Sequence, residues 1–307
     1  MNLLEFPEAT NLVFPSPIQL LNSPLLDAKK IKLYVKREDL IHPIIGGNKW
    51  RKLKYNIIEL QRSKAKTILS FGGAYSNHIY ALAGVGQLFG LNTIGIIRGE
   101  SCEPLNPTLA YAKKVGMQLH YVSRKDYRLK ETSKFIESLK SQFGEFTLIP
   151  EGGSNELALP GCAEIIEELD AQLSGQYDTV CLPCGTAGTL AGLISSGTKK
   201  NLLGIAVLKG AKFLHENINH LLSESEFVDK NKSWKINLNY HFDGYAKKTP
   251  ELMRFISNFN QEFNINIERI YSGKMFYGLF DLIKNDFFEQ GTTIVALHTG
   301  GMQNEDI

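Results

Sequence analysis

The alternation of short apolar runs with longer stretches of helical period most constrains how this chain can fold. From residue 50 onward, runs rich in Val, Ile and Leu, such as 67–73, are followed by stretches in which apolar residues recur every three or four positions. This order is typical of βαβ units, in which a right-handed crossover helix joins two parallel strands. The sequence therefore predicts an α/β fold whose sheets are mainly parallel.

The same pattern places the individual elements along the chain. We expect strands at 67–73, 93–99, 119–124, 146–150, 178–184, 202–208, 236–242, 267–272 and 292–299. We expect helices at 50–60, 76–90, 109–117, 125–142, 156–173, 188–197, 250–263 and 273–285. At about 150 residues per domain, the length of 307 residues predicts two domains. Glycine-rich breaks at 46–49 and 150–155 bracket an αβ block of the size of a small domain.

The charge balance and the cysteines narrow the class of partner and the compartment. The 34 Lys and Arg residues nearly balance the 32 Asp and Glu residues, which disfavours nucleic acid and anionic membranes and favours a small-molecule partner. The four cysteines are too few and too unevenly spaced for a disulfide framework, and no apolar run approaches the roughly 18 residues of a membrane span. The first ten residues carry Glu5 and Glu8 without a cationic start. We therefore expect a cytoplasmic protein that is neither exported nor embedded in a membrane.

Lys49 follows two glycines at the start of a predicted helix, with Arg51 and Lys52 close behind. An amine in this position can form an imine with a carbonyl compound, because glycine lets a ligand approach closely and partial desolvation lowers the pKa of the amine. A solvated basic helix start is the alternative, and local sequence alone favours it.

Ser76, Asn77 and His78 lie where a strand delivers the chain to a helix N-terminus, whose backbone N–H groups can bind a carboxylate or a phosphate. Ser76 could also act as a nucleophile, although its neighbours do not form the G-x-S-x-G elbow of an α/β-hydrolase. Local sequence alone favours simple helix capping by Ser76 and Asn77.

The segment 185–189 comes between a strand and a helix and offers backbone amides with two hydroxyls, which indicates a phosphate site. It matches neither a Walker loop nor G-x-G-x-x-G, so adenine nucleotides are not indicated. A plain tight turn that permits close helix-to-strand packing is the alternative. Cys181 and Cys184 form a C-x-x-C without a second ligand pair, which favours strand packing over zinc or redox chemistry.

Together with a C-terminal group of tyrosine and hydroxyl residues, these segments resemble the 1-aminocyclopropane-1-carboxylate deaminase and D-cysteine desulfhydrase family of pyridoxal phosphate enzymes. The matching segments run in order over nearly the whole chain: FPSPIQLL, KREDL, GGNKWRKLKY, GGAYSNH, LNPTL, PEGGSN, GTAGTLAG, GYAKKTP, YSGKMFYGL and HTGG. The combination is highly specific, although no single segment is.

The resemblance implies a role for each candidate residue. Lys49 would form the internal aldimine with pyridoxal 5′-phosphate, and Asn77 would bond the 3′-oxygen of the cofactor. Ser76, Asn77 and His78 would hold the carboxylate of the substrate, with Thr299 nearby, and Tyr245 and Tyr271 would line the substrate side of the ring. The cofactor phosphate would be held by Lys52 and by the cup formed by Gly185, Thr186, Ala187, Gly188 and Thr189.

The resemblance also implies the architecture. It implies a tryptophan-synthase-β-like fold with two open, mainly parallel twisted sheets flanked by helices. A larger, discontinuous domain of residues 1–50 plus 150–307 would bind the cofactor, and a smaller αβ domain of residues 51–149 would be inserted into it. Members are commonly homodimers. Tyr75 and Tyr80 depart from the Gln and Arg that are usual at their positions, which affects the expected substrate pocket.

Ser272 bears on the choice between the two activities of the family. By similarity it would face the pyridine nitrogen, where deaminases carry a glutamate that keeps the nitrogen protonated and desulfhydrases carry Thr or Ser. Thr299 likewise stands where deaminases tend to have Leu. The resemblance thus favours elimination of hydrogen sulfide from D-cysteine, giving pyruvate and ammonia. The alternatives are 1-aminocyclopropane-1-carboxylate deaminase, a non-catalytic pyridoxal phosphate carrier and, least favoured, a phosphate-ester hydrolase that uses Ser76.

Overall fold

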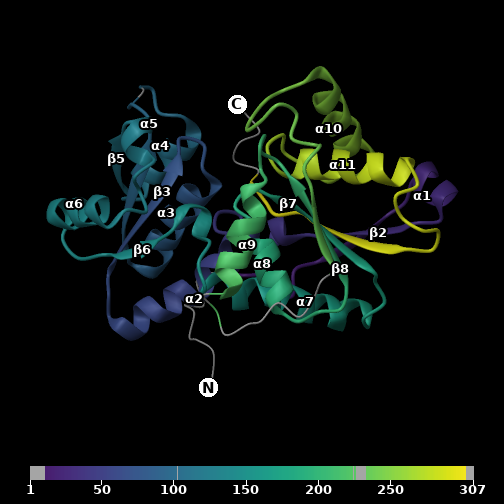
Figure 1. The fold of residues 1–307 in the computed structure, drawn as a ribbon, viewed down its shortest axis with the longest axis horizontal. Helices are drawn as coiled ribbons and strands as arrows, with labels where there is room; N and C mark the ends of the chain where they lie inside the picture. Colours follow the sequence, from purple (N-terminus) through teal and green to yellow (C-terminus); the bar gives the residue numbers. More distant parts are fainter. Residues whose placement is uncertain (1–10, 102, 224, 226–232, 302–307) are drawn as a thin grey trace.

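The computed structural model describes residues 11–101, 103–223, 225 and 233–301. Two open sheets lie side by side, each covered by helices (Figure 1). The larger has the strand order β1-β2-β10-β7-β8-β9 and the smaller β5-β4-β3-β6, and every neighbouring pair except β1 and β2 is parallel. The predicted α/β fold with two mainly parallel sheets is therefore confirmed. The first ten residues and Cys102, on which part of the expected location rested, lie outside the described residues.

The strands of each sheet come from separate parts of the chain. The larger sheet consists of β1 (Ile18–Leu21), β2 (Lys32–Lys36), β7 (Thr179–Cys184), β8 (Asn201–Ala206), β9 (Trp234–Asn237) and β10 (Thr293–Leu297). The smaller sheet consists of β3 (Thr67–Gly73), β4 (Asn92–Arg98), β5 (Gln118–Val122) and β6 (Thr147–Ile149). This division agrees with an inserted smaller domain, while its expected boundaries stay a prediction.

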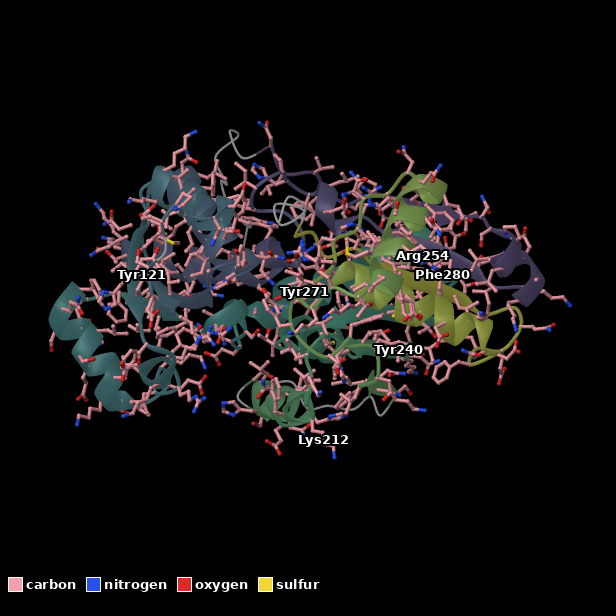
Figure 2. All side chains as sticks on the ribbon, turned by 90° about the horizontal axis from the view of Figure 1, so that it is seen from above. Tyr121, Lys212, Tyr240, Arg254, Tyr271 and Phe280 are labelled. Carbon is pink, nitrogen blue, oxygen red and sulfur yellow. The ribbon has the colours of Figure 1, made fainter. Side chains whose placement is uncertain are left out.

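Helices cover both faces of the larger sheet, and its core is correspondingly apolar. The faces are covered by α1 (Pro24–Lys29), α10 (Pro250–Phe263) and α11 (Ser272–Lys284) on one side and by α7 (Ala158–Leu173), α8 (Gly188–Ser195) and α9 (Phe213–Ser223) on the other. The smaller sheet is associated with α2 (Asn48–Ser63), α3 (Asn77–Phe89), α4 (Pro107–Lys114), α5 (Arg124–Tyr127) and α6 (Ser133–Phe143). In Figure 2, Tyr271 lies between the part of the molecule that carries Tyr121 and the part that carries Phe280.

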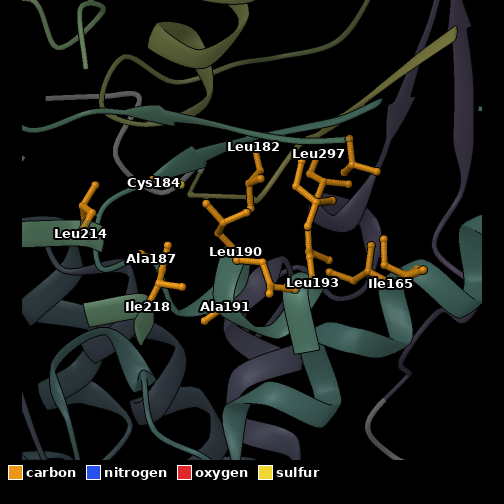
Figure 3. Packing of buried hydrophobic residues seen from close by; sticks show 14 of the residues in the cluster. Ile165, Leu182, Cys184, Ala187, Leu190, Ala191, Leu193, Leu214, Ile218 and Leu297 are labelled. Atoms are coloured by element: carbon orange, nitrogen blue, oxygen red, sulfur yellow. The ribbon is translucent and has the colours of Figure 1, made fainter. Parts of the chain in front are cut away.

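The packing beneath β7 explains why this strand is an unbroken apolar run. Leu182 of β7 and Leu297 of β10 face Leu190 and Leu193 of α8, and all four side chains are fully buried (Figure 3). A parallel strand with helices on both faces has no solvent side, so apolar residues occupy consecutive positions instead of alternating. Cys181 and Cys184 are buried in the same strand, one toward each face, as the packing interpretation predicted.

Three expected elements differ from the structure. The helix expected at 125–142 is divided into α5 and α6, because the hydroxyls of Ser123 and Thr132 each cap a new helix by accepting a backbone N–H three residues on. The strand expected at 267–272 is wrong, because the carboxylate of Glu268 accepts the amides of residues 270–272 and thereby starts α11. In addition, β9 ends at Asn237, earlier than expected.

Helix α2 connects the two sheets through a buried cluster of ion pairs. The Arg51 guanidinium donates to both oxygens of Glu38 at 2.8 and 2.9 Å and to both oxygens of Glu168, on α7, at the same distances. Lys36 of β2 also donates to Glu168, at 2.6 Å. A Cβ on Gly161 of α7 would lie 1.9 Å from the Arg51 carbonyl oxygen, so only glycine allows this approach. The position of α2 is thus fixed against the larger sheet.

Replacing Arg51 with Met should destabilise the fold by about 3–5 kcal/mol, because it leaves the buried Glu38 carboxylate without its cation. The matched control is Arg62→Met on the same helix, where an exposed pair with Glu59 at 3.7 Å should contribute less than about 1 kcal/mol. Urea unfolding of both variants gives the comparison. Equal stabilities for the two variants would show that the cluster does not anchor α2.

Candidate active site

A cavity of about 240 Å³ lies where the carboxyl ends of strands from both sheets face each other, which is where ligands bind in open α/β folds. It brings together all the predicted site residues except Ser272: Lys49, Lys52, Ser76, Asn77, His78, Gly185, Thr186, Ala187, Gly188, Thr189, Tyr245, Tyr271 and Thr299. These residues are up to 250 positions apart, between Lys49 and Thr299 (299 − 49), so only the fold unites them.

Lys49 enters the cavity from the first turn of α2. Gly47 has a φ of 70°, and a Cβ on it would lie 2.2 Å from the carbonyl oxygen of Thr299, so glycine lets the helix start pack against this wall. The amine donates to the Asn48 side chain at 3.2 Å. Burial, with a smaller effect of the Lys52 charge, lowers the pKa of Lys49 to about 7. The amine is therefore a competent nucleophile near neutral pH and not a solvated cation.

Lys52 lies one turn further on, in a polar cluster at the start of α8. Its ammonium donates to the carbonyl of Gly152 at 3.0 Å, to the hydroxyl of Ser154 at 2.9 Å and to that of Thr186 at 3.3 Å. A Cβ on Gly188 would lie 2.4 Å from the Ser154 oxygen and 3.0 Å from the Lys52 nitrogen. A cation, two hydroxyls and a helix N-terminus without a Cβ in the way suit a phosphate group. The sequence did not identify Ser154 as a candidate phosphate ligand, because the PEGGSN segment that contains it indicated only a glycine-rich break.

The first turn of α3 forms the opposite wall. The Ser76 hydroxyl accepts the amide of Ile79 at 3.3 Å, so Ser76 caps the helix, as local sequence suggested. The backbone amide of Ser76 donates to the carbonyl of Gly73 at 3.0 Å. The backbone amide of His78 has no acceptor within the part of the chain that the structure describes. This amide, together with the positive end of the helix dipole, suits a carboxylate.

His78 is buried and has a fixed tautomer. The Ser70 hydroxyl donates to the carbonyl of Ile149 at 2.7 Å, so His78 Nε2, also 2.7 Å from that hydroxyl, must donate to it. Nδ1 is then an acceptor, and it has no partner among the described residues. Burial and the nearby lysine charges hold the pKa of His78 well below its usual range, so the ring is neutral. A buried acceptor in the cavity wall fits a ligand that donates a hydrogen bond.

Lys274 holds the tyrosine side of the cavity together. Its buried ammonium donates to the carbonyls of Gly244 at 2.6 Å, His241 at 2.9 Å and Val207 at 3.2 Å. These bonds tie the loop before Tyr245 to the helix that follows Tyr271, and the two phenol rings meet edge to face at 6.1 Å. Lys274 was not recognised in the sequence because a lysine inside an apolar helix carries no local signal of its partners.

Ser272 lies outside the residues that line the cavity. Its fully buried hydroxyl accepts the amide of Glu268 at 2.9 Å and lies 3.1 Å from the Glu268 carboxylate. Tyr75 is exposed, and Tyr80 stacks on Tyr111 at 4.3 Å beside a second cavity of about 360 Å³. Among the described residues, no group of three or more His, Cys, Asp or Glu side chains could hold a metal ion, and no helix is long and apolar enough to cross a membrane.

Comparison with known proteins defines the class to which this fold and site belong. The family described as "Pyridoxal-phosphate dependent enzyme" matches residues 10–300. A protein of Pyrococcus furiosus named putative 1-aminocyclopropane-1-carboxylate deaminase is 30% identical over 98% of this chain and 93% of its own length. One of Arabidopsis thaliana, named bifunctional D-cysteine desulfhydrase/1-aminocyclopropane-1-carboxylate deaminase, mitochondrial, is 29% identical over 94% of this chain and 76% of its own. A solved structure of an ACC deaminase homologue superimposes with a TM-score of 0.83 at 28% identity, covering 95% of this chain and 91% of that one.

The chain belongs to the family of pyridoxal-phosphate dependent enzymes. Within it, the chain is a member of the 1-aminocyclopropane-1-carboxylate deaminase and D-cysteine desulfhydrase family, as the sequence resemblance predicted. The cofactor and the tryptophan-synthase-β-like fold are confirmed with it, and the carrier and hydrolase alternatives lose their support.

Replacing Gly188 with Val should weaken pyridoxal phosphate binding at least about tenfold, because the side chain would displace Ser154 and Lys52 from the cluster. The control is Gly278→Ala on α11, whose Cβ would instead press on the ring of Tyr240 at 2.7 Å, away from the cluster. Spectrophotometric titration of the apoprotein measures the affinity, and thermal unfolding reports any loss of stability. Unchanged affinity in a folded Gly188→Val protein would place the phosphate elsewhere.

Proposed function

We propose that this enzyme releases ammonia from a small amino acid and leaves a 2-oxo acid. One observation carries the proposal: a single cavity unites a lysine amine that is half neutral near pH 7, a polar cup for a phosphate and a helix N-terminus for a carboxylate. When bound, pyridoxal phosphate supplies an electron sink for negative charge that develops at the α-carbon of the substrate.

The residues of the chain would divide the work as follows. Lys49 attaches the cofactor through its neutral amine and afterwards carries protons to and from the substrate. Lys52, Ser154 and the segment 185–189 hold the phosphate, and Asn77 bonds the 3′-oxygen. The first turn of α3 orients the substrate carboxylate, and Tyr245 and Tyr271 line the substrate side of the cofactor ring.

1-Aminocyclopropane-1-carboxylate is the first substrate to test, because it appears in the names of the relatives from both Pyrococcus furiosus and Arabidopsis thaliana. Its product would be 2-oxobutyrate. D-Cysteine is the second, favoured by the neutral side chains of Ser272 and Thr299, and would give pyruvate, hydrogen sulfide and ammonia. The homodimer and the cytoplasmic location stay predictions.

The purified protein should be yellow, and borohydride reduction followed by peptide mapping should find the pyridoxyl group on Lys49. Because burial lowers the pKa of this amine to about 7, the rate of cofactor attachment to apoprotein should rise with pH through about 7 and not through 10. Lys49→Met is the control and should retain no reducible adduct. A label on Lys52 or Lys274 would overturn the assignment.

Changing Ser272 to Glu together with Thr299 to Leu should raise 1-aminocyclopropane-1-carboxylate deamination relative to D-cysteine desulfhydration. A carboxylate at position 272 would favour the protonated ring nitrogen and so strengthen the electron sink. The measurement is the ratio of the two kcat/KM values. Ser272→Gln with Thr299→Leu is the control of equal size without the charge, and both variants are checked for folding because Ser272 contacts Glu268. Equal ratios in the two double variants would show that this charge does not select the reaction.

A further inference from the structure

Arg98 is the cationic side chain of the cavity wall for which the proposed function has no role. It is the last residue of β4 and lines the same cavity as Lys49, Ser76 and Tyr245. Arg98 is exposed, so it lies at the mouth of the cavity, whereas the lysines lie deeper. Its chemistry therefore bears on what enters the site and not on how the cofactor is held.

The guanidinium lies close to the expected position of the substrate. In the sheet register Arg98 is opposite Gly73, and its Nη2 atom is 3.5 Å from the place that a Cβ on Gly73 would take. Gly73 is also the residue whose carbonyl accepts the amide of Ser76. Arg98 therefore lies in van der Waals contact with the turn that leads into α3.

Among the described residues, no carboxylate lies within ion-pair distance of the Arg98 guanidinium. Its guanidinium stands over the ring of Tyr127, 5.6 Å from the centroid, which holds the group in place but leaves its charge. Glu151, the acidic residue of the cavity wall, has Lys130 at 3.7 Å instead. An arginine in this condition is ready to bind an anion from solution.

The cavity has more groups that can bind an anion than the cofactor phosphate and the α-carboxylate of a simple amino acid require. The cluster of Lys52 takes a phosphate and the first turn of α3 takes an α-carboxylate, so Arg98 provides a third position. We propose that Arg98 is a specificity residue that binds an acidic group on the side chain of the substrate amino acid. This inference rests on the proposed function and defines its substrate class as amino acids with a second acidic group.

Pairs of amino acids that differ only in acid and amide test this directly. We suggest aspartate with asparagine, glutamate with glutamine, and S-carboxymethylcysteine with S-carbamoylmethylcysteine, each as both enantiomers. Dissociation constants come from changes in cofactor absorbance of the holoenzyme, measured by stopped flow before products form. At least one acid should bind roughly three- to tenfold more tightly than its amide, and the preference should shrink with added salt because Arg98 is exposed.

The variants identify the residue that is responsible. Arg98→Gln should abolish the preference for the acid and Arg98→Lys should restore part of it, whereas Arg124→Gln, which removes an exposed charge at the end of the neighbouring strand, should leave it intact. A parent without any preference would overturn the inference. Equal weakening of acid and amide by Arg98→Gln would also overturn it, because Arg98 would then bind the α-carboxylate. If the parent changed its spectrum with no amino acid, the proposed function itself would fail.

Discussion

The anchoring of α2 is the constraint on which the site depends. This helix carries both lysines of the cavity, while the phosphate cup and the tyrosines belong to the larger sheet. The bonds of Arg51 to Glu38 and Glu168 fix the helix from one side, and the glycine contacts at positions 47 and 161 let its backbone approach its neighbours closely. A small rotation of α2 would move Lys49 and Lys52 together. The buried ion pairs therefore fix the positions of both lysines, although they take no part in the reaction.

Much of this arrangement could be predicted from the sequence, because its causes are local. The period of the apolar residues predicted an α/β fold with mainly parallel sheets, and the position of 185–189 between a strand and a helix indicated an anion site. At 76–78 the local sequence favoured the helix cap that the structure contains. The same local reasoning failed where the secondary structure depends on a side-chain hydrogen bond that the apolar pattern does not reveal. At 267–272, where we expected a strand, the carboxylate of Glu268 accepts the amides of Tyr271 and Ser272, and a helix begins there instead.

Ser272 illustrates the limit of inference by similarity. Its hydroxyl and amide both bond Glu268, so the residue belongs to the cap that starts α11 and places Tyr271. Burial raises the pKa of the Glu268 carboxyl, while the backbone amides that it accepts act in the opposite direction. Any electrostatic role of position 272 therefore includes the charge of Glu268, which resemblance at a single position does not reveal.

The two lysines of the cavity must be in opposite charge states, although they are buried side by side. Lys52 must be charged to hold a phosphate, and Lys49 must be neutral to attack a carbonyl. Burial lowers the pKa of both, but three oxygen acceptors surround the ammonium of Lys52, whereas Lys49 has the Asn48 oxygen and the repulsion of Lys52. The resulting pKa values, about 8 for Lys52 and about 7 for Lys49, have the required order. The charge of Lys52 adds to burial in lowering the pKa of Lys49, so the protonated state of one lysine favours the neutral state of the other.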